Sequence, residues 1–226
     1  MIRHYSNIVL NIPHSTSAGV EDAGWPKTDE FKRIVNTWTD WHTDTLFSSD
    51  DERVQSVRFP ISRFVVDAER LIDDPMEKIG QGIIYKRYDG FCRKVKDEKE
   101  LMTYYYNHIE QLKEQLTPQS ILIDCHSFPS FLGDVDVCIG YNDDWSRPTQ
   151  EVIDYVTGKF TDAGYNVGIN EPYSNSISPK CKFEYPSLMI ELNKRIYMDE
   201  DTLELTDGAK KVKAILNEIY NKLLGL

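Results

Sequence analysis

The sequence lacks any long apolar run. None of its segments could span a bilayer, for which a helix needs about 20 consecutive apolar residues. Residues 1–5 (MIRHY) also lack the apolar core of a secretory signal peptide. We therefore expect a cytoplasmic protein that does not insert into a membrane.

Positive charge is scarce as well. The chain has 37 Asp and Glu against 26 Lys and Arg, which gives a net charge of −11. Nucleic acid or an anionic membrane surface would require a basic face, so we expect neither as a partner. An anionic small substrate remains compatible with this charge, because a local cluster of Arg and metal can outweigh the field of the whole chain.

Cysteines are few and widely spaced. The four (Cys92, Cys125, Cys138 and Cys181) include no CxxC pair, and we expect all of them to be free thiols. Cys125 is followed directly by His126, the two residue types of a nucleophilic dyad. Adjacent residues on a strand point to opposite faces, however, so the thiol and the imidazole would diverge. We expect no such dyad.

Strand-like and helical segments alternate along most of the chain. At 226 residues, with 40% hydrophobic residues, the chain is long enough to cover a central sheet on both faces. The alternation favours an α/β layered sheet over a helical bundle or a β-sandwich. No internal repeat or domain-length linker divides it. We expect one domain over residues 1–226, a three-layer α/β/α arrangement with a central mixed sheet.

Three apolar, strand-like runs are each followed by residues that can bind a metal or move a proton. These are residues 8–13 before His14, residues 120–123 before Asp124 and His126, and residues 188–190 before Glu191. Open α/β sheets hold ligands at the carboxyl ends of their strands. Two histidines and a carboxylate at such ends predict a metal site that carries out hydrolysis. A single histidine after a strand would more often be structural.

A catalytic zinc site usually takes three protein ligands and leaves one position open for water. His14 and His126 supply two, whereas His4 and His108 lie in unremarkable terminal and helical settings. A helical run is predicted from Thr28 to about residue 47, and Asp40 in it is the best third ligand. Asp44 lies four residues on, on the same face, and both could instead be solvated helix carboxylates. His42 points away from that face and is a weaker candidate.

Glu191 and two arginines could complete such a site. A buried Glu at a strand end is costly unless it is paired or used, and near a metal it would be a general base. The alternative is a buried ion pair with Arg195 or Arg70. Arg63 and Arg70 flank a predicted strand at residues 64–66, and their planar guanidinium groups suit a substrate that carries carboxylates. Each, taken singly, is more often a surface or ion-pair residue.

Five short motifs, spread over nearly the whole chain, resemble those of the N-formylglutamate amidohydrolase family and occur in its order. They are residues 11–15 (NIPHS), 40–42 (DWH), 62–67 (SRFVVD), 124–127 (DCHS) and 191–198 (ELNKRIYM). That family is similar to the zinc carboxypeptidases and the succinylglutamate desuccinylases. The resemblance therefore implies a phosphorylase/hydrolase-like, zinc exopeptidase-like fold and one divalent metal ion, Zn²⁺.

The resemblance also implies roles for individual residues. His14 and His126 match metal ligands, Glu191 matches the base, and Arg63 and Arg70 match carboxylate clamps. Asp40 would be the third ligand, although the His-x-x-Glu spacing of the carboxypeptidases is absent. Asp124 would order the loop of His126 as a hydrogen-bonding partner.

Ser17 stands where the carboxypeptidases have the ligand Glu. Two features depart from the pattern of the family itself. Glu69 stands where Asn commonly precedes the second arginine. Residues 170–176 (NEPYSNS) replace a Gly-rich loop. These changes leave the metal chemistry intact and bear on the identity of the substrate.

The activity that these expectations imply is hydrolysis of a small N-acyl acidic amino acid, with N-formyl-L-glutamate as the first substrate and histidine degradation as its setting. A zinc carboxypeptidase-like enzyme, or another deacylase of N-acyl amino acids or γ-glutamyl peptides, is the alternative. A non-catalytic amino-acid-binding module on the same fold is the alternative from another class, but a binder needs no general base.

Overall fold

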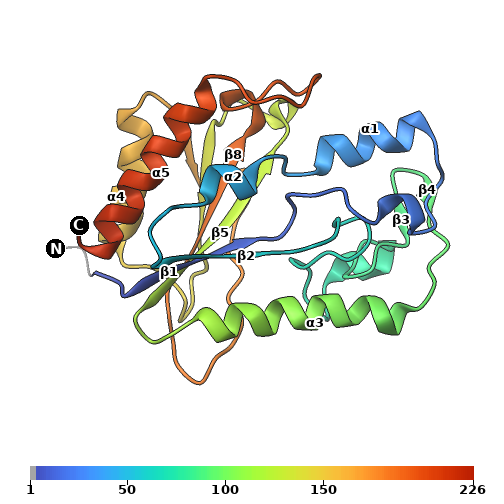
Figure 1. The fold of residues 1–226 in the computed structure, drawn as a ribbon, viewed down its shortest axis with the longest axis horizontal. Helices are drawn as coiled ribbons and strands as arrows, with labels where there is room; N and C mark the ends of the chain where they lie inside the picture. Colours follow the sequence, from blue (N-terminus) through green and yellow to red (C-terminus); the bar gives the residue numbers. More distant parts are fainter. Residues whose placement is uncertain (1–3) are drawn as a thin grey trace.

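The computed structural model describes residues 4–226, and a twisted sheet of six strands runs through its centre (Figure 1). The strand order is β2-β1-β5-β8-β6-β7. The first four strands in this order are parallel to one another, whereas β6 is antiparallel to β8 and parallel to β7. The sheet is mixed, and the fold is α/β, as predicted.

The strands of this sheet are β1 (Asn7–Ile12), β2 (Val54–Arg58), β5 (Ser120–Phe128), β6 (Val137–Gly140), β7 (Val167–Ile169) and β8 (Ser187–Asn193). A two-stranded ribbon consists of β3 (Arg87–Tyr88) and β4 (Phe91–Cys92). The helices are α1 (Asp29–Trp38), α2 (Thr43–Phe47), α3 (Glu98–Gln115), α4 (Gln150–Asp162) and α5 (Gly208–Leu224). Short 3-10 helices are η1 (Val20–Asp22), η2 (Pro75–Ile79), η3 (Ser130–Leu132) and η4 (Lys194–Ile196). No helix within residues 4–226 has the length and apolar character that a membrane crossing requires.

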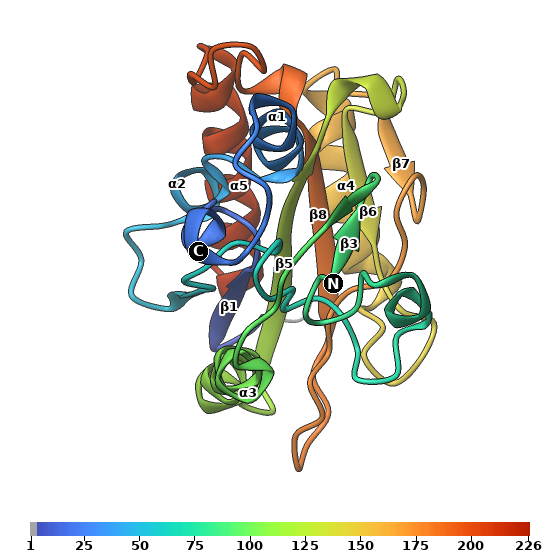
Figure 2. The ribbon, with the colours of Figure 1, turned by 90° about the vertical axis from the view of Figure 1, so that its right-hand side faces the viewer.

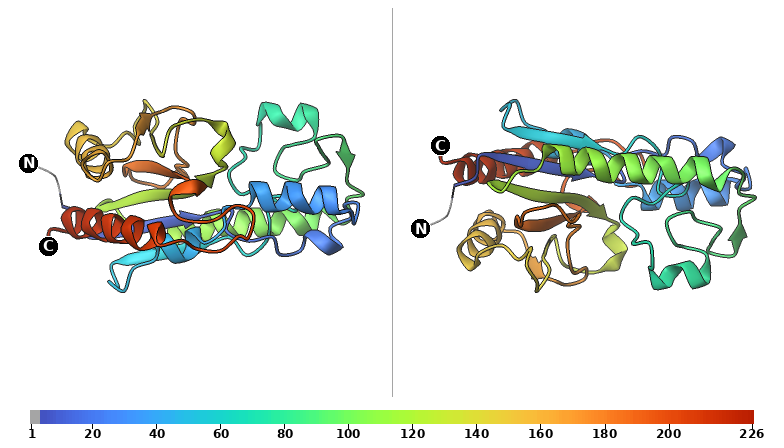
Figure 3. Two further views of the ribbon diagram at one scale, coloured as in Figure 1. Left: turned by 90° about the horizontal axis from the view of Figure 1, so that it is seen from above. Right: turned by 90° about the horizontal axis from the view of Figure 1, so that it is seen from below.

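Helices cover both faces of the sheet. The largest apolar core joins α2, α4 and α5 to one face, with Ile8, Leu10, Ile121 and Ile123 among its buried residues. On the other face, Leu112 and Leu116 at the end of α3 pack on Val9 and Leu122. Figure 1 shows α3 along the lower side of the sheet, and Figure 3 shows α5 at the end of the molecule away from α1.

The face that carries α3 changes character along the strands. Its apolar half lies under α3, but the next residues of the same face are Asn11, Asp124 and His126, because side chains alternate along a strand. Helix α3 reaches this polar half through His108, whose Nε2 contacts Asn11 Oδ1. The α1 region and the segment from β2 to α3 extend beyond the carboxyl ends of the parallel strands (Figures 1 and 2).

The helix predicted from Thr28 to about residue 47 is wrong as one element. Thr28 caps α1 by accepting a hydrogen bond from the Phe31 amide, as expected, but α1 ends at Trp38. Residues 39–42 form an irregular link in which His42 has a φ of +67°. Asp40 therefore lies outside both helices and shares no helix face with Asp44.

One other element prediction is wrong. Residues 64–66 form a turn rather than a strand, since the Val65 amide donates to the Ser62 carbonyl and no sheet partner lies beside them among the described residues. Before the last helix begins at Gly208, Leu205 forms an isolated bridge with Met198. The other strand runs are confirmed: residues 8–12 lie in β1, which ends one residue before Pro13, residues 120–123 in β5 and residues 188–190 in β8.

Candidate metal and catalytic centre

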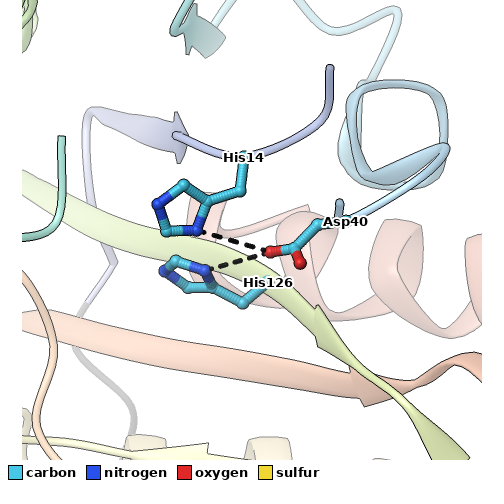
Figure 4. A group of neighbouring side chains, drawn as sticks. All are labelled: His14, Asp40 and His126. Carbon is cyan, nitrogen blue, oxygen red and sulfur yellow. Dashed lines mark hydrogen bonds and ion pairs between the residues drawn. The ribbon is translucent and has the colours of Figure 1, made fainter. Parts of the chain in front are cut away.

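His14, Asp40 and His126 converge on one point beyond the sheet (Figure 4). The Nδ1 atoms of His14 and His126 lie 3.7 and 3.3 Å from the same oxygen, Oδ2 of Asp40. The two imidazole rings are 5.2 Å apart and tilted by 54°. All three residues are buried. Their potential ligand atoms lie within 4.8 Å of one another, a spacing that suits one bound cation.

Each of the three residues reaches this point from a different element. His14 follows β1, and His126 lies within β5, which extends to Phe128 rather than ending before the histidine. Asp40 arrives through the link between α1 and α2, where its amide donates to the His14 carbonyl at 2.9 Å. The break in the helix therefore carries the carboxylate to the two histidines.

On each imidazole, the Nε2 atom, which faces away from Asp40, is hydrogen-bonded to a carboxylate. His14 donates from Nε2 to Asp67 at 2.8 Å, and His126 donates from Nε2 to Asp124 at 3.0 Å. A hydrogen bond of this kind sets the tautomer of a metal-binding histidine and leaves the other nitrogen available. His14 Nδ1 is buried and has no hydrogen-bond partner within residues 4–226. The donor set of two Nδ1 atoms and a carboxylate fits a divalent cation such as zinc.

The charges of this group depend on one another. Burial raises the pKa of Asp40, but the hydrogen bonds and charges of His126 and His14 outweigh this effect and hold it below the usual range. Burial opposes the charged form of His126, yet Asp124 and Asp40 raise its pKa well above the usual value. In the metal-free protein a proton therefore occupies the position where a cation would bind, and metal binding would release protons.

Glu191 lies beside this group on the neighbouring strand. It is opposite His126 in the β5–β8 register, so both side chains emerge on the same face. Its side chain is buried, and Oε2 has no hydrogen-bond partner in the described part of the chain. Burial raises the pKa of Glu191 to about 8, although the charge of His126 acts in the opposite direction.

The alternative that Glu191 forms an ion pair with Arg195 or Arg70 finds no support in the structure. Arg195 contacts Asp136 at 2.9 Å, and Arg70 lies near Asp67 and Asp74. No ion pair of Glu191 is present within residues 4–226.

The two arginines of the sequence prediction meet at Asp67. Arg63 donates from Nη2 to Asp67 at 3.2 Å, and Arg70 Nε lies 3.6 Å from the same oxygen. The Tyr85 hydroxyl donates to this oxygen at 2.8 Å. Both side chains keep some exposed surface, 21% for Arg63 and 24% for Arg70.

A cavity of about 420 Å³ joins these groups. Its lining includes both histidines, Asp40, Glu191 and both arginines, together with Trp38, Phe64, Glu69, Gln81, Tyr85, Tyr88, Ser127, Tyr173, Ser174 and Met189. One hollow thus holds potential metal ligands, a buried carboxyl of raised pKa and two cationic groups, which is a combination suited to hydrolysis of an anionic substrate.

The other ligand candidates lie elsewhere. Asp44 pairs with Arg58 at 2.9 Å, and His42 Nε2 contacts the Leu203 carbonyl at 2.8 Å. Neither belongs to the group around Asp40. Cys125 is fully buried in the main apolar core, on the face opposite His126, so the two residues point apart as predicted and form no dyad.

Sequence reasoning did not assign Asp67 or Asn11 to the site. Asp67 accepts a hydrogen bond from His14 and lies close to both arginines. In the sequence, the feature that could have indicated this role is an acidic residue four positions after Arg63 and three before Arg70. Asn11 contacts Asp124 on the next strand, and its signal was a polar amide within an apolar strand. Glu69, the departure from the family pattern, accepts from Asn11 and lies 3.9 Å from His126.

Comparison with solved structures gives the same fold. An N-formylglutamate amidohydrolase from Ralstonia eutropha JMP134 superposes with a TM-score of 0.78 at 19% identity, covering 99% of this chain and 94% of that one. A gene product of Agrobacterium tumefaciens superposes with a TM-score of 0.65 at 14% identity, covering 98% and 91%. No curated protein sequence matches the chain.

The family assignment rests on the sequence itself. The family model of N-formylglutamate amidohydrolase matches residues 6–198, a span that contains both histidines, Asp40, both arginines and Glu191. This match agrees with the five motifs and with the fold. The chain belongs to the N-formylglutamate amidohydrolase family.

Proposed function

We propose that the protein is a zinc-dependent amidohydrolase that converts N-formyl-L-glutamate and water to formate and L-glutamate, with residues 1–226 as one catalytic domain. The observation that carries the proposal is the convergence of His14 Nδ1, His126 Nδ1 and Asp40 beside Glu191, whose buried Oε2 has no hydrogen-bond partner in the described part of the chain. When bound to His14, Asp40 and His126, the zinc ion would polarise the formyl oxygen and lower the pKa of water towards about 7.

Glu191 moves the proton in this proposal. Its carboxylate takes a proton from the attacking water and delivers it to the leaving nitrogen, so that the C–N bond breaks and glutamate departs as an amine. A general base works best when its pKa lies near the working pH. The pKa of the buried Glu191 is about 8 in the absence of metal, and a cation beside it would lower this pKa towards about 7.

Arg63 and Arg70 orient the substrate by binding its carboxylates, for which a guanidinium offers two parallel donors. Asp67 holds the two arginines in place and thereby matches two positive charges to a dianionic substrate. The remaining groups of the cavity exclude bulk water and strengthen these interactions.

Metal analysis of the purified protein, followed by a formate-release assay with and without chelator, tests the proposal. We expect about one zinc per chain, release of formate from N-formyl-L-glutamate, loss of activity on chelation and recovery on adding zinc. Full activity of metal-free protein would contradict the mechanism. Tight binding of an amino acid without metal or turnover would favour a binding module instead.

Substitution of Arg63 separates substrate binding from chemistry. Arg63→Gln should raise KM for N-formyl-L-glutamate roughly 10- to 100-fold, because hydrogen bonds to charged groups contribute about 1.5–3 kcal/mol. Arg63→Lys keeps the charge but not the planar fork and should recover only part of the loss. Arg147→Gln, a change at a partly exposed arginine outside the cavity, serves as the control in the same steady-state assay.

A second substrate class is favoured by the shape of the cavity. Glu69, Arg70, Ser174 and Met189 line both this cavity and a larger neighbouring hollow of about 720 Å³. A longer N-acyl amino acid or a γ-glutamyl peptide would fill both. A panel of formyl, acetyl, succinyl and peptide substrates compares the two classes by kcat/KM.

A further inference from the structure

The buried side-chain amide of Asn11 links the hydrogen-bond networks that orient His14 and His126, which are called the two arms of the site. Asn11 lies on β1, is fully buried and faces the same side of the sheet as Asp124. Its Nδ2 donates to Asp124 Oδ1 at 2.8 Å and to Glu69 Oε1, and its Oδ1 contacts His108 Nε2 at 2.7 Å. A buried polar group is costly unless its hydrogen bonds are made, and here both sides of the amide are used.

The neighbours of Asn11 determine which way its amide points. Asp124, when ionised, can only accept hydrogen bonds, so the NH₂ side of the amide must face it. The carbonyl side must then face His108, which donates from Nε2. Burial lowers the pKa of His108 to about 4, so the ring is neutral at pH 7. Because the Asn11 carbonyl can only accept, the single ring proton is on Nε2, the nitrogen that contacts it. His108 thus supplies the donor that completes the arrangement.

Both arms depend on this amide. On one side, Asp124 Oδ1 accepts from Asn11 and from His126 Nε2, which turns His126 Nδ1 towards Asp40. On the other side, the side chain of Glu69 accepts from Asn11, and the Glu69 amide donates to Asp67 Oδ1 at 3.0 Å.

The same Asp67 oxygen accepts from His14 Nε2 and so orients the second histidine. The chain of contacts runs from α3 through β1 to both imidazoles. His108 itself is held by an edge-to-face contact with Phe59, with ring centroids 5.1 Å apart.

We propose that His108 is a positioning residue which, by fixing the amide of Asn11, holds His14 and His126 with their Nδ1 atoms directed at the cation position. His108 lies on α3 and does not line the cavity. Its effect is on the affinity for the metal and not on the chemical step. This inference rests on the proposed metal-dependent function, and its test has a readout that needs no metal.

The first measurement is zinc affinity by competition with a chromogenic chelator. His108→Leu removes the donor and leaves the Asn11 carbonyl unpaired, and we expect zinc affinity to fall about 10- to 100-fold, the effect of losing a group that orients a ligand. His108→Gln, whose amide can donate in place of Nε2, should retain most of the affinity.

Leu112→Ala is the matched control. Leu112 lies one turn further along α3, is fully buried and belongs to the apolar cluster that includes Val9 and Leu122. It should lower Tm at least as much as His108→Leu while leaving zinc affinity near that of the wild type. Unchanged affinity in His108→Leu, or an equal loss in Leu112→Ala, would overturn the proposal.

The second measurement is the ¹⁵N and proton NMR spectrum of the histidine side chains in metal-free protein. We expect His108 to be protonated on Nε2 alone and His126 to show a slowly exchanging Nε2 proton that is lost in His108→Leu. An Nδ1-protonated His108, or an unchanged His126 signal in the variant, would refute the positioning role. If the wild type binds no zinc, the proposed function fails, and these spectra still decide the inference.

Discussion

Glu191→Gln is expected to retain zinc but to lose turnover of N-formyl-L-glutamate by about 10²- to 10⁴-fold, the usual contribution of a general base. The amide has nearly the same shape and remains on β8 opposite His126, so the positions of the proposed metal ligands should be preserved. It cannot take a proton from water, however. The loss should appear in kcat, with KM nearly unchanged.

The control for this substitution is Glu184→Gln, at an exposed glutamate that precedes β8. It should leave kcat and zinc content unchanged. Turnover of Glu191→Gln within about threefold of the wild type would remove Glu191 from the mechanism, since a base contributes far more than that. Loss of zinc together with activity would instead assign Glu191 to the metal.

The pH dependence of stability gives Glu191→Gln a second readout in metal-free protein. The pKa of Glu191 is raised from 4.5 to about 8 by burial, so the folded state holds this proton more tightly than the unfolded state does. The corresponding stability is present below about pH 4.5 and is lost as the pH rises to about 8. The variant should therefore become more stable relative to the wild type over this range, at up to about 1.4 kcal/mol per pKa unit.

His126→Ala should abolish zinc retention through gel filtration, with a loss of affinity of at least about 100-fold, because a ligand contributes more than the groups that orient it. It removes the Nδ1 donor and also the partner of two buried carboxylates, Asp40 and Asp124. Breaking a buried charged pair costs about 3–5 kcal/mol, so a lower Tm is expected as well.

His126→Asn and His4→Ala separate the loss of the ligand from misfolding. Asn can still donate a hydrogen bond to one of the two carboxylates, so His126→Asn should be more stable than His126→Ala yet still lack tightly bound zinc. His4 is exposed, and its replacement should change neither zinc content nor Tm. Wild-type zinc content in a folded His126 variant would exclude this histidine as a ligand.

Local sequence patterns were enough to predict the sheet and the position of three residues at its edge. Apolar runs specify buried strands wherever helices cover both faces, and side chains alternate along each strand. His14, His126 and Glu191 come from or directly after such strands, and the parallel arrangement of β1, β5 and β8 places them at one edge. The separation of Cys125 from His126 follows from the same alternation.

The position of Asp40 could not be obtained in this way. Thr28 and the acidic first turn predict where α1 begins, but its end after Trp38 depends on contacts with distant segments, including the hydrogen bond from the Asp40 amide to the His14 carbonyl. The predicted helix face shared by Asp40 and Asp44 was wrong for this reason. Asp40 was nevertheless the residue that the structure brings to the histidines.

Asn11, Asp67 and His108 show the same limit. Asn11 lies on a strand, His108 on a helix and Asp67 in an irregular segment, and each of the three has a hydrogen-bond partner far away in the sequence. His108 has the spacing of the buried stripe of α3, three residues after Tyr105 and four before Leu112, and this stripe alone would predict core packing.

The sequence by itself determined the α/β class, the strands that carry His14, His126 and Glu191, and the family to which the chain belongs. These features depend on periodicity and on short motifs, which are local in the chain. Only the tertiary structure decided that Asp40 joins the two histidines, that Asp67 and Asp124 orient them, and that Asn11 links both arms. Such contacts join residues far apart in the sequence, and their geometry is set by how the layers pack.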